Sequence, residues 1–303
     1  MRIGRTAVVT DTGRRRIGNE DAFVFKPPFF AIADGMGGAR AGEIAAGLAA
    51  AALEEGAEPT SAEGIVALID EANRQIWERS IQDPDTSGMG TTVTAALVAA
   101  DPGKIVIGHV GDSRAYLYRD GTLAQLTTDH SLVVELVESG ILTPEEAERH
   151  PQRSAITRAV GTEPTVEVDA FTVDAEPGDL YLICSDGLTD MLTEEELEDV
   201  LAKTAADPAR AADALVAAAN ARGGEDNITV VLFEMTDADA PAEDAEPGVG
   251  EEPPIEAADH LEQEPTRSLR RHGAGPGGRA AAILLLLAVL GIGLLLLYLG
   301  FRR

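Results

Sequence analysis

The 303-residue chain contains very little cysteine. Cys184 is its one cysteine, so no disulfide can form within the chain, which suits a reducing compartment such as the cytosol. The same scarcity excludes a cysteine-based zinc cluster. The five histidines show no H-x-x-x-H pair, the spacing typical of a helical zinc site.

Basic residues are also scarce. The chain has 24 lysines and arginines against 52 aspartates and glutamates, and its net charge is −28. Such a chain has no basic stripe that could displace the counterions of a nucleic acid, so we expect no nucleic-acid partner. We expect most of the acidity to serve solubility. A hydrophobic content of 45% still allows a sizeable core.

Two common phosphate-handling motifs are absent. The sequence has no G-x-x-x-x-G-K-[ST] loop for nucleotide phosphates. A cysteine phosphatase needs an arginine six positions after its nucleophile, and Asp190 stands at that distance from Cys184. Because Cys184 ends the apolar run 180–183, we expect it to be a buried, inert thiol.

Acidic residues beside glycine or asparagine occur at four separated places. These are Asn19-Glu20-Asp21, Asp34-Gly35, Ser185-Asp186-Gly187 and Asp226-Asn227. A carboxylate at a strand end with glycine beside it can project into a cleft while the backbone turns. Several such carboxylates together favour hard divalent cations, which prefer oxygen ligands. The pattern indicates Mg²⁺ or Mn²⁺ chemistry on a phosphate ester.

Five motifs carry a family resemblance. Arg16-Ile17-Gly18-Asn19-Glu20-Asp21 resembles the R-x-x-N-E-D opening of the metal-dependent Ser/Thr protein phosphatases, the PPM or PP2C family. The other four follow in family order: Asp34-Gly35-Met36-Gly37-Gly38, Gly111-Asp112-Ser113-Arg114, Ser185-Asp186-Gly187 and Asp226-Asn227-Ile228-Thr229. Each motif alone is weak, but five in order from Arg16 to Thr229 are highly specific.

The resemblance implies a site for two divalent ions, Mg²⁺ or Mn²⁺. Asp34 would bridge both ions, and the backbone carbonyl of Gly35 would complete the shell of one. Asp186 and Asp226 would hold the other. A pair of ions activates a hydroxide that attacks the phosphate directly, with no phosphoenzyme.

The resemblance also implies roles around the ions. Arg16 would bind phosphate oxygens, which its planar guanidinium matches. Glu20 and Asp21 would contact metal-bound waters or fix the orientation of the ligands. Asn227 would orient Asp226 or a bound water.

Two further features leave alternatives open. Asp112 either helps to bind a third, weaker ion, as in bacterial relatives, or is a turn aspartate between two strands. The segment Thr128–Arg158 resembles the family's flap, which would sit by the site and choose substrates, although its helices could equally serve packing.

Met36 stands where some members carry a histidine proposed as general acid. Neither His109 nor His130 is assigned that role.

The chain divides into three parts by composition. Residues 1–236 read as one phosphatase-like domain, with no signal peptide at the N-terminus. Residues 237–279 form a predicted disordered linker, with eleven acidic residues between Asp237 and Glu264 and a basic end. Residues 280–301 are 22 uncharged residues, about 33 Å of helix and enough to cross a membrane.

The predicted fold class is α+β, because strands dominate two blocks and helices cluster between and after them. The resemblance sharpens this to a four-layer α-β-β-α sandwich of two antiparallel sheets flanked by helices, plus a C-terminal transmembrane helix. Predicted strands are 6–10, 22–25, 29–33, 91–100, 104–110, 115–118, 180–184 and 228–233. Predicted helices are 39–55, 62–80, 132–138, 144–148, 194–202 and 208–221, with capping boxes at Thr60, Thr143 and Thr193.

We therefore expect a protein phosphatase for phosphoserine and phosphothreonine that opposes bacterial Ser/Thr kinases. Arginines before residues 280–301 outnumber those after them, which predicts a single-pass membrane protein with its catalytic domain in the cytoplasm. Its partners would be phosphorylated proteins, including Ser/Thr kinases and their substrates. The alternative is a non-catalytic phosphoprotein-binding or scaffold module, which should have lost at least one of Asp34, Asp186 and Asp226.

Overall fold

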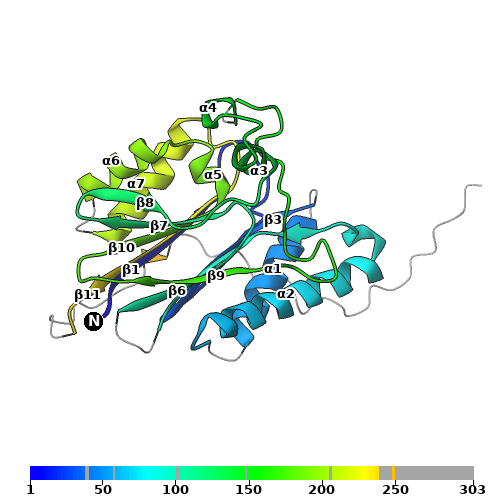
Figure 1. Ribbon diagram of the computed structural model, residues 1–303, viewed down its shortest axis with the longest axis horizontal. Helices are drawn as coiled ribbons and strands as arrows, with labels where there is room; N and C mark the ends of the chain where they lie inside the picture. Colours follow the sequence, from blue (N-terminus) through cyan, green and yellow to red (C-terminus); the bar gives the residue numbers. More distant parts are fainter. Residues whose placement is uncertain are drawn as a thin grey trace, which may run out of the picture. The chain divides into compact units, whose positions relative to one another are not determined.

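A computed structural model describes residues 1–37, 41–56, 59–99, 103–147, 149–204, 207–238 and 248–249. Two six-stranded sheets and the helices on their outer faces make up this part of the chain (Figure 1). The arrangement confirms the predicted α+β class and its two sheets.

The first sheet has the strand order β12-β1-β11-β10-β7-β8. Its strands are β1 (Arg2–Asp11), β7 (Arg114–Arg119), β8 (Thr122–Gln125), β10 (Leu180–Cys184), β11 (Ile228–Thr236) and β12 (Gly248–Val249). All pairs are antiparallel except β1 with β12. Strand β12 lies in the segment that the sequence predicts to be disordered, and it pairs with the free backbone edge of β1.

The second sheet has the order β2-β3-β5-β6-β9, and a short strand, β4, also pairs with β3. Its strands are β2 (Asp21–Lys26), β3 (Phe29–Met36), β4 (Gly90–Thr91), β5 (Val93–Val98), β6 (Lys104–Val110) and β9 (Asp169–Asp174). Every pair is antiparallel. The single strand predicted over 91–100 is broken at Thr92, which bonds to Asp34 instead.

Three buried apolar clusters separate four layers. One lies between the second sheet and helices α1 (Ala41–Glu55) and α2 (Ala62–Gln82). Another lies between the first sheet and helices α6 (Glu194–Thr204) and α7 (Pro208–Ala221). The third lies between the two sheets. Figure 1 shows the two helix pairs on opposite outer faces, as the predicted sandwich requires.

Strand β11 shows why the sequence forms these layers. Ile228, Val230 and Leu232 face the α6–α7 cluster, while Val231 and Phe233 face the other sheet. Both faces of this central strand are covered, so the run Val230–Phe233 is apolar at consecutive positions rather than at alternate ones. The Phe233 ring stacks on Phe30 of the other sheet, with ring centroids 4.7 Å apart, and on Tyr181 of the neighbouring strand β10, at 5.0 Å.

Short elements connect the layers. They are α3 (Leu132–Glu138), α4 (Pro144–Ala147), α5 (Asp186–Thr189) and the 3-10 turn η1 (Pro84–Thr86). The capping boxes at Thr143 and Thr193 are confirmed by reciprocal bonds with Glu146 and Glu196. The box at Thr60 is wrong by one residue, because the Ser61 hydroxyl accepts the Gly64 amide proton instead.

No helix within the described ranges is long and apolar enough to span a membrane. The run 280–301, predicted as a transmembrane helix, lies outside those ranges, as do residues 250–279 of the predicted linker.

Candidate active site

The core between the two sheets becomes polar at one end. Along each strand, alternate residues face this core, and in four strands the row passes from apolar to polar side chains at the same end. The polar residues that end these rows are Asp21, Asp34, Ser185 and Thr229. Strand periodicity therefore brings together residues from all the acidic motifs except that of Asp112.

Asp21 joins the two sheets. One of its carboxylate oxygens accepts hydrogen bonds from the hydroxyls of Ser185, at 2.8 Å, and Thr229, at 2.6 Å. These hydroxyls belong to the first sheet, whereas Asp21 begins β2 in the second. Its other oxygen, Oδ1, is buried without a hydrogen-bond partner.

Asp34 is the cross-strand partner of Asp21. Its backbone is fixed by Thr92, whose hydroxyl accepts the Asp34 amide proton at 3.1 Å and whose amide donates to the Asp34 carbonyl at 2.9 Å. The Thr91 hydroxyl donates to the same carbonyl at 2.8 Å. Two consecutive threonines thus hold the Asp34 backbone, a role that the sequence analysis did not identify. The one sequence signal for this role was that both threonines fall within the predicted strand 91–100.

Gly35 occupies a space that admits no side chain. A Cβ atom there would lie 2.2 Å from the Gly42 carbonyl oxygen and 2.6 Å from that of Glu20. The Gly35 amide donates to the Glu20 carbonyl at 3.2 Å. Glycine at this position lets the strand beside Asp34 pack directly against two other backbone segments.

Asp186 and Asp226 belong to neighbouring turns of the first sheet. Asp186 begins α5, directly after β10, and Asp226 precedes β11. The two turns are in close contact, because a Cβ atom on Gly187 would lie 2.0 Å from the Asn227 carbonyl oxygen. Asp186 and Asp226 therefore lie at one end of the first sheet, and their charges act on Asp34 of the second sheet.

Asn227 organises the loop before β2. Its side-chain amide donates to the carbonyls of Thr12 and Gly18, both at 3.0 Å, and its side-chain oxygen accepts the Glu20 amide proton at 2.8 Å. Its backbone amide donates to the Asp226 carboxylate at 2.8 Å. It thus orients Asp226, as the resemblance implies, and it also positions the Arg16–Glu20 loop, which the sequence analysis missed.

The electrostatics show that the carboxylates converge. Burial raises the pKa of Asp34 well above its ordinary value, and so do the charges of Asp21, Asp186, Asp112 and Asp226. Burial likewise raises the pKa of Asp21 to about 6. For Asp186, burial comes first and the neighbouring aspartates follow, with a pKa again well above its ordinary value. Aspartates from all five motifs therefore repel one another within one largely buried group.

Arg16 lies at the edge of this group. Its guanidinium donates to the Asp226 carboxylate at 2.6 Å, and its side chain is 47% exposed. The charges of Asp226, Glu20 and Asp34 favour its charged form. Glu20 lies near the same edge, where burial raises its pKa against the opposing effect of Arg16.

Asp112 is buried and its Oδ1 atom has no hydrogen-bond partner. Burial raises its pKa to about 7, and the charge of Asp129 adds to the shift. Nearby, His109 is fully buried between the Thr94 hydroxyl and the Thr128 carbonyl, and burial lowers its pKa to about 4. These contacts indicate that His109 is a structural residue, and we do not assign it the role of general acid.

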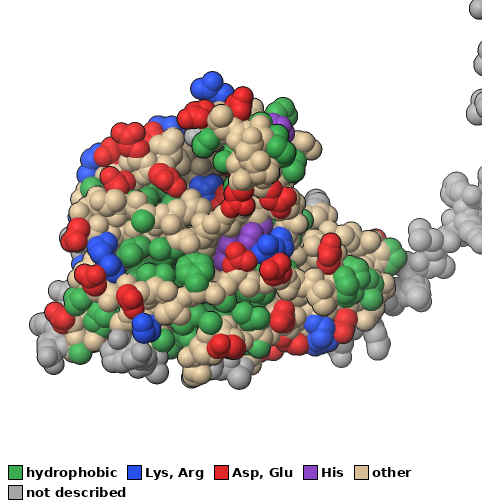
Figure 2. Space-filling model, viewed as in Figure 1, with side chains coloured by type: hydrophobic (Ala, Val, Ile, Leu, Met, Phe, Trp, Pro, Cys, Tyr) green, Lys and Arg blue, Asp and Glu red, His purple; other side chains and the backbone are tan. Residues whose placement is uncertain are grey.

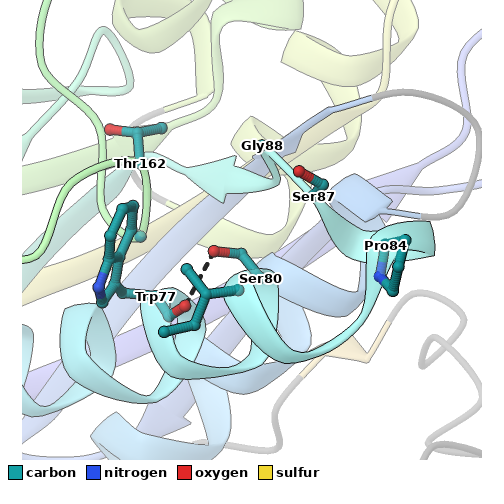
Figure 3. Close-up of a pocket in the computed structure, with 8 residues that line it drawn as sticks. Trp77, Ser80, Pro84, Ser87, Gly88 and Thr162 are labelled. Atoms are coloured by element: carbon teal, nitrogen blue, oxygen red, sulfur yellow. Dashed lines mark hydrogen bonds between the residues drawn. The ribbon is translucent and has the colours of Figure 1, made fainter.

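One surface pocket lies apart from these carboxylates. It has a volume of about 610 Å³ and lies between α2, the turn Pro84–Gly88 and Thr162. Figure 3 shows Trp77 and Ser80 of α2 on one side and Thr162 on the other, with the Ser80 hydroxyl bonded to the Trp77 carbonyl at 2.9 Å. No carboxylate lines it, so we do not assign the pocket to the chemistry of the site.

The carboxylate group fits divalent cations by its chemistry. In the described ranges, no group of three or more His, Cys, Asp or Glu side chains lies close enough together to hold a metal ion as it stands. Like charges hold such a set apart, and a bound cation removes that repulsion. The unpartnered, buried Oδ1 atoms of Asp21 and Asp112 are oxygen donors of the kind that such cations or their waters take.

Comparisons with known proteins agree with this geometry. The family model described as protein phosphatase 2C matches residues 14–219. The serine/threonine phosphatase stp of Listeria welshimeri is 44% identical over 238 residues, which cover 74% of this chain and 93% of that protein.

Two solved structures extend the similarity to the fold. The crystal structure of the Mycobacterium tuberculosis serine/threonine phosphatase PstP/Ppp has a TM-score of 0.73 at 40% identity, covering 78% of this chain and 100% of that one. The catalytic domain of a phosphatase PstP in complex with two manganese ions has a TM-score of 0.70 at 38% identity, covering 78% and 99%. Sequence, fold and carboxylate group thus agree, and this chain belongs to the protein phosphatase 2C family.

Proposed function

We propose that this chain removes phosphate from phosphoserine and phosphothreonine in proteins, at the carboxylate group around Asp34. It is a protein-serine/threonine phosphatase, in line with its family and with relatives that carry that name. The observation that carries the proposal is the convergence of Asp34 with Asp21, Asp112, Asp186 and Asp226 at one end of the inter-sheet core.

Asp34, Asp186 and Asp226 would hold two Mg²⁺ or Mn²⁺ ions, together with the backbone carbonyl of Gly35. Bound ions of this kind neutralise phosphate charge and lower the pKa of a water molecule. A solved relative contains two manganese ions, which supports this number. Asp112 would contribute to a third ion, because it is buried beside the group with an unpartnered oxygen.

Arg16 would bind the phosphate group of the substrate. Its exposed guanidinium already holds one carboxylate oxygen of Asp226, so it can also reach an anion at the edge of the site. Binding there would fix the phosphorus in line for attack, a positioning effect rather than a proton transfer. Glu20 and Asp21 would orient water and the ligand side chains, Asp21 through its free Oδ1 atom.

The test is the metal dependence of phosphopeptide hydrolysis. Activity should require added Mn²⁺ or Mg²⁺ and disappear in EDTA. Asp34→Asn should remove it, while the matched control Asp174→Asn, whose side chain is 85% exposed on β9, should leave it unchanged. Near-normal turnover of the Asp34→Asn protein in Mn²⁺ would refute the assignment of Asp34.

We also propose that residues 280–301 anchor the domain to a membrane, with the domain in the cytoplasm beside membrane Ser/Thr kinases. The 22-residue uncharged run and the arginines before it, Arg267, Arg270, Arg271 and Arg279, support this arrangement. Residues 1–236 would form the catalytic domain and 237–279 the linker. Membrane fractionation of the full chain and of a chain ending at 279 tests it: only the full chain should sediment with membranes.

A further inference from the structure

Two consecutive residues, Asp129 and His130, hold both ends of the Gly111–Arg114 turn. The Arg114 guanidinium forms a two-pronged pair with the Asp129 carboxylate, with contacts of 2.9 Å and 2.6 Å. At the other end, the His130 amide donates to the Gly111 carbonyl at 2.7 Å, and the Gly111 amide donates to His130 Nδ1 at 3.0 Å. Asp112 lies between these two anchors, together with Ser113.

The turn is pressed against the threonine that positions Asp34. Gly111 has a φ of +111°, and a Cβ atom there would lie 2.6 Å from the Thr92 side chain. The hydroxyls of Thr92 and Ser113 are 2.6 Å apart. A shift of Gly111 would therefore reach Asp112 directly and Asp34 through Thr92.

His130 also closes the base of the segment that carries α3 and α4. Its carbonyl accepts the Thr157 amide proton at 2.8 Å, and the next residues continue the pairing through Ser131 with Ile156. Figure 2 shows histidine, acidic and basic side chains gathered beneath the part of the molecule where Figure 1 places α3 and α4.

The two ring nitrogens of His130 have different partners. Because an amide N–H can only donate, Nδ1 must be the acceptor toward Gly111, and the proton of the neutral ring lies on Nε2. Nε2 can donate that proton to the Asp169 carboxylate, which lies 3.3 Å away. Arg158 Nη1 lies 2.9 Å from Nε2, but both nitrogens are then donors, so the Arg158 hydrogen bond goes to Asp169, at 2.7 Å. One nitrogen thus serves the turn and the other serves the segment ending at Arg158.

We propose that His130 is a positioning residue that holds Asp112 in the carboxylate group through Gly111, and that it ties this position to the base of the 131–158 segment. The inference rests on the proposed function, because it assigns Asp112 to cation binding. None of the roles proposed above links the 131–158 segment to the carboxylate group.

Two amide variants separate the two sides of the ring. His130→Asn keeps a polar oxygen near the place of Nδ1 and can still accept the Gly111 amide proton. His130→Gln places its amide near Nε2 and leaves the Gly111 amide without that acceptor. Titration with Mn²⁺, followed by the paramagnetic resonance signal of the free ion, gives the number and affinity of bound ions without measuring activity.

In His130→Gln we expect the weakest Mn²⁺ ion to bind about 10-fold more weakly or worse, the size of effect seen when a residue behind a ligand is changed. Asp112→Asn should lose the same ion, and His130→Asn should bind like the wild type. Wild-type binding by His130→Gln, or equal losses in both amide variants, would overturn the inference alone. Failure of the wild type to bind Mn²⁺ would overturn the proposed function as well.

A second measurement uses the wild-type protein and therefore does not depend on whether a variant folds. Hydrogen exchange of the wild-type protein should slow at the Gly111 amide and at the Thr157 amide together when Mn²⁺ fills the weakest site. Protection of Gly111 with no change at Thr157 would show that the turn and the segment are independent.

Discussion

The two ends of strand β10 carry aspartates in opposite surroundings. Asp179, just before the strand, is 1% exposed, and its two oxygens accept from the Arg119 guanidinium, both at 2.6 Å. Asp186, just after the strand, has four other aspartates as its charged neighbours. The protein supplies its own cation at one end and only more negative charge at the other.

The difference follows from the cost of burying charge. A carboxylate taken out of water needs a counter-charge or a proton. Asp179 has its counter-charge in Arg119, so it joins β7 to β10 as a structural residue. Asp186 has none within the described residues, which explains why its pKa is raised. A site of this kind is built for a cation from solution.

The strongest test of the comparison is Asp186→Asn. Losing one ligand of a bound ion should remove on the order of 4 kcal/mol of transition-state stabilisation, or about 10³-fold in kcat/KM. In chelator, however, the variant should be at least as stable as the wild type, because the substitution removes a repelling charge. Phosphopeptide kinetics in Mn²⁺ and urea unfolding in EDTA check the two halves. Loss of stability in EDTA would show that Asp186, like Asp179, is a structural residue.

Asp179→Asn should show the opposite pattern. The substitution removes the buried carboxylate of the pair and leaves Arg119 with the exposed Glu176 carboxylate, at 2.8 Å, which should cost roughly 2 kcal/mol of unfolding free energy. At temperatures where the variant stays folded, kcat/KM should remain that of the wild type. Urea unfolding followed by fluorescence of Trp77, the chain's one tryptophan, measures the loss. A large loss of turnover with unchanged stability would contradict the structural role.

Asp112 allows a test by pH. Burial raises its pKa to about 7, while an unfolded aspartate titrates at about 3.9. Between these values the folded protein keeps a proton that the unfolded chain releases, so this group's contribution to stability falls as the pH rises. In EDTA, Asp112→Asn should therefore gain on the order of 2 kcal/mol over the wild type between about pH 4 and about pH 7. A difference that stays constant with pH would be evidence against a buried, unpaired carboxyl.

The sequence predicted the site better than the contacts around it. Asp21, Asp34, Asp186 and Asp226 stand at or near the ends of short, strongly apolar strands, so their common location follows from the strand pattern. The bonds of Asn227 to Thr12, Gly18 and Glu20 cross more than 200 residues of chain. No local pattern encodes such contacts, and the same holds for His130 with Gly111.

The missed elements are edge strands or very short helices. Strands β8 and β9 lie at sheet edges and have no fully buried residue, so their sequences lack a clear apolar run. Helix α5 has four residues, too few for a helical period. At the start of α2, Thr60 and Ser61 are adjacent cap candidates, and local sequence does not decide between them.

Substitution of Arg16, the partner of Asp226, should have the smallest effect on stability, and it tests whether burial decides which ion pairs are structural. Their 2.6 Å contact has the same length as that of Arg119 with Asp179, but the two side chains are 47% and 34% exposed. A solvent-exposed ion pair contributes about 0–1 kcal/mol, so Arg16→Ala should change the unfolding free energy by less than about 1 kcal/mol. The KM for a phosphopeptide should rise, because the guanidinium that would bind phosphate is gone.

Arg16→Lys separates charge from shape. A lysine keeps the positive charge but lacks the planar fork that matches two phosphate oxygens, so it should restore only part of the lost substrate affinity. Stability should be the same in both variants. If Arg16→Ala instead costs about as much stability as Asp179→Asn, then contact length rather than burial decides which ion pairs are structural. The explanation given for the difference between Asp179 and Asp186 would then be wrong.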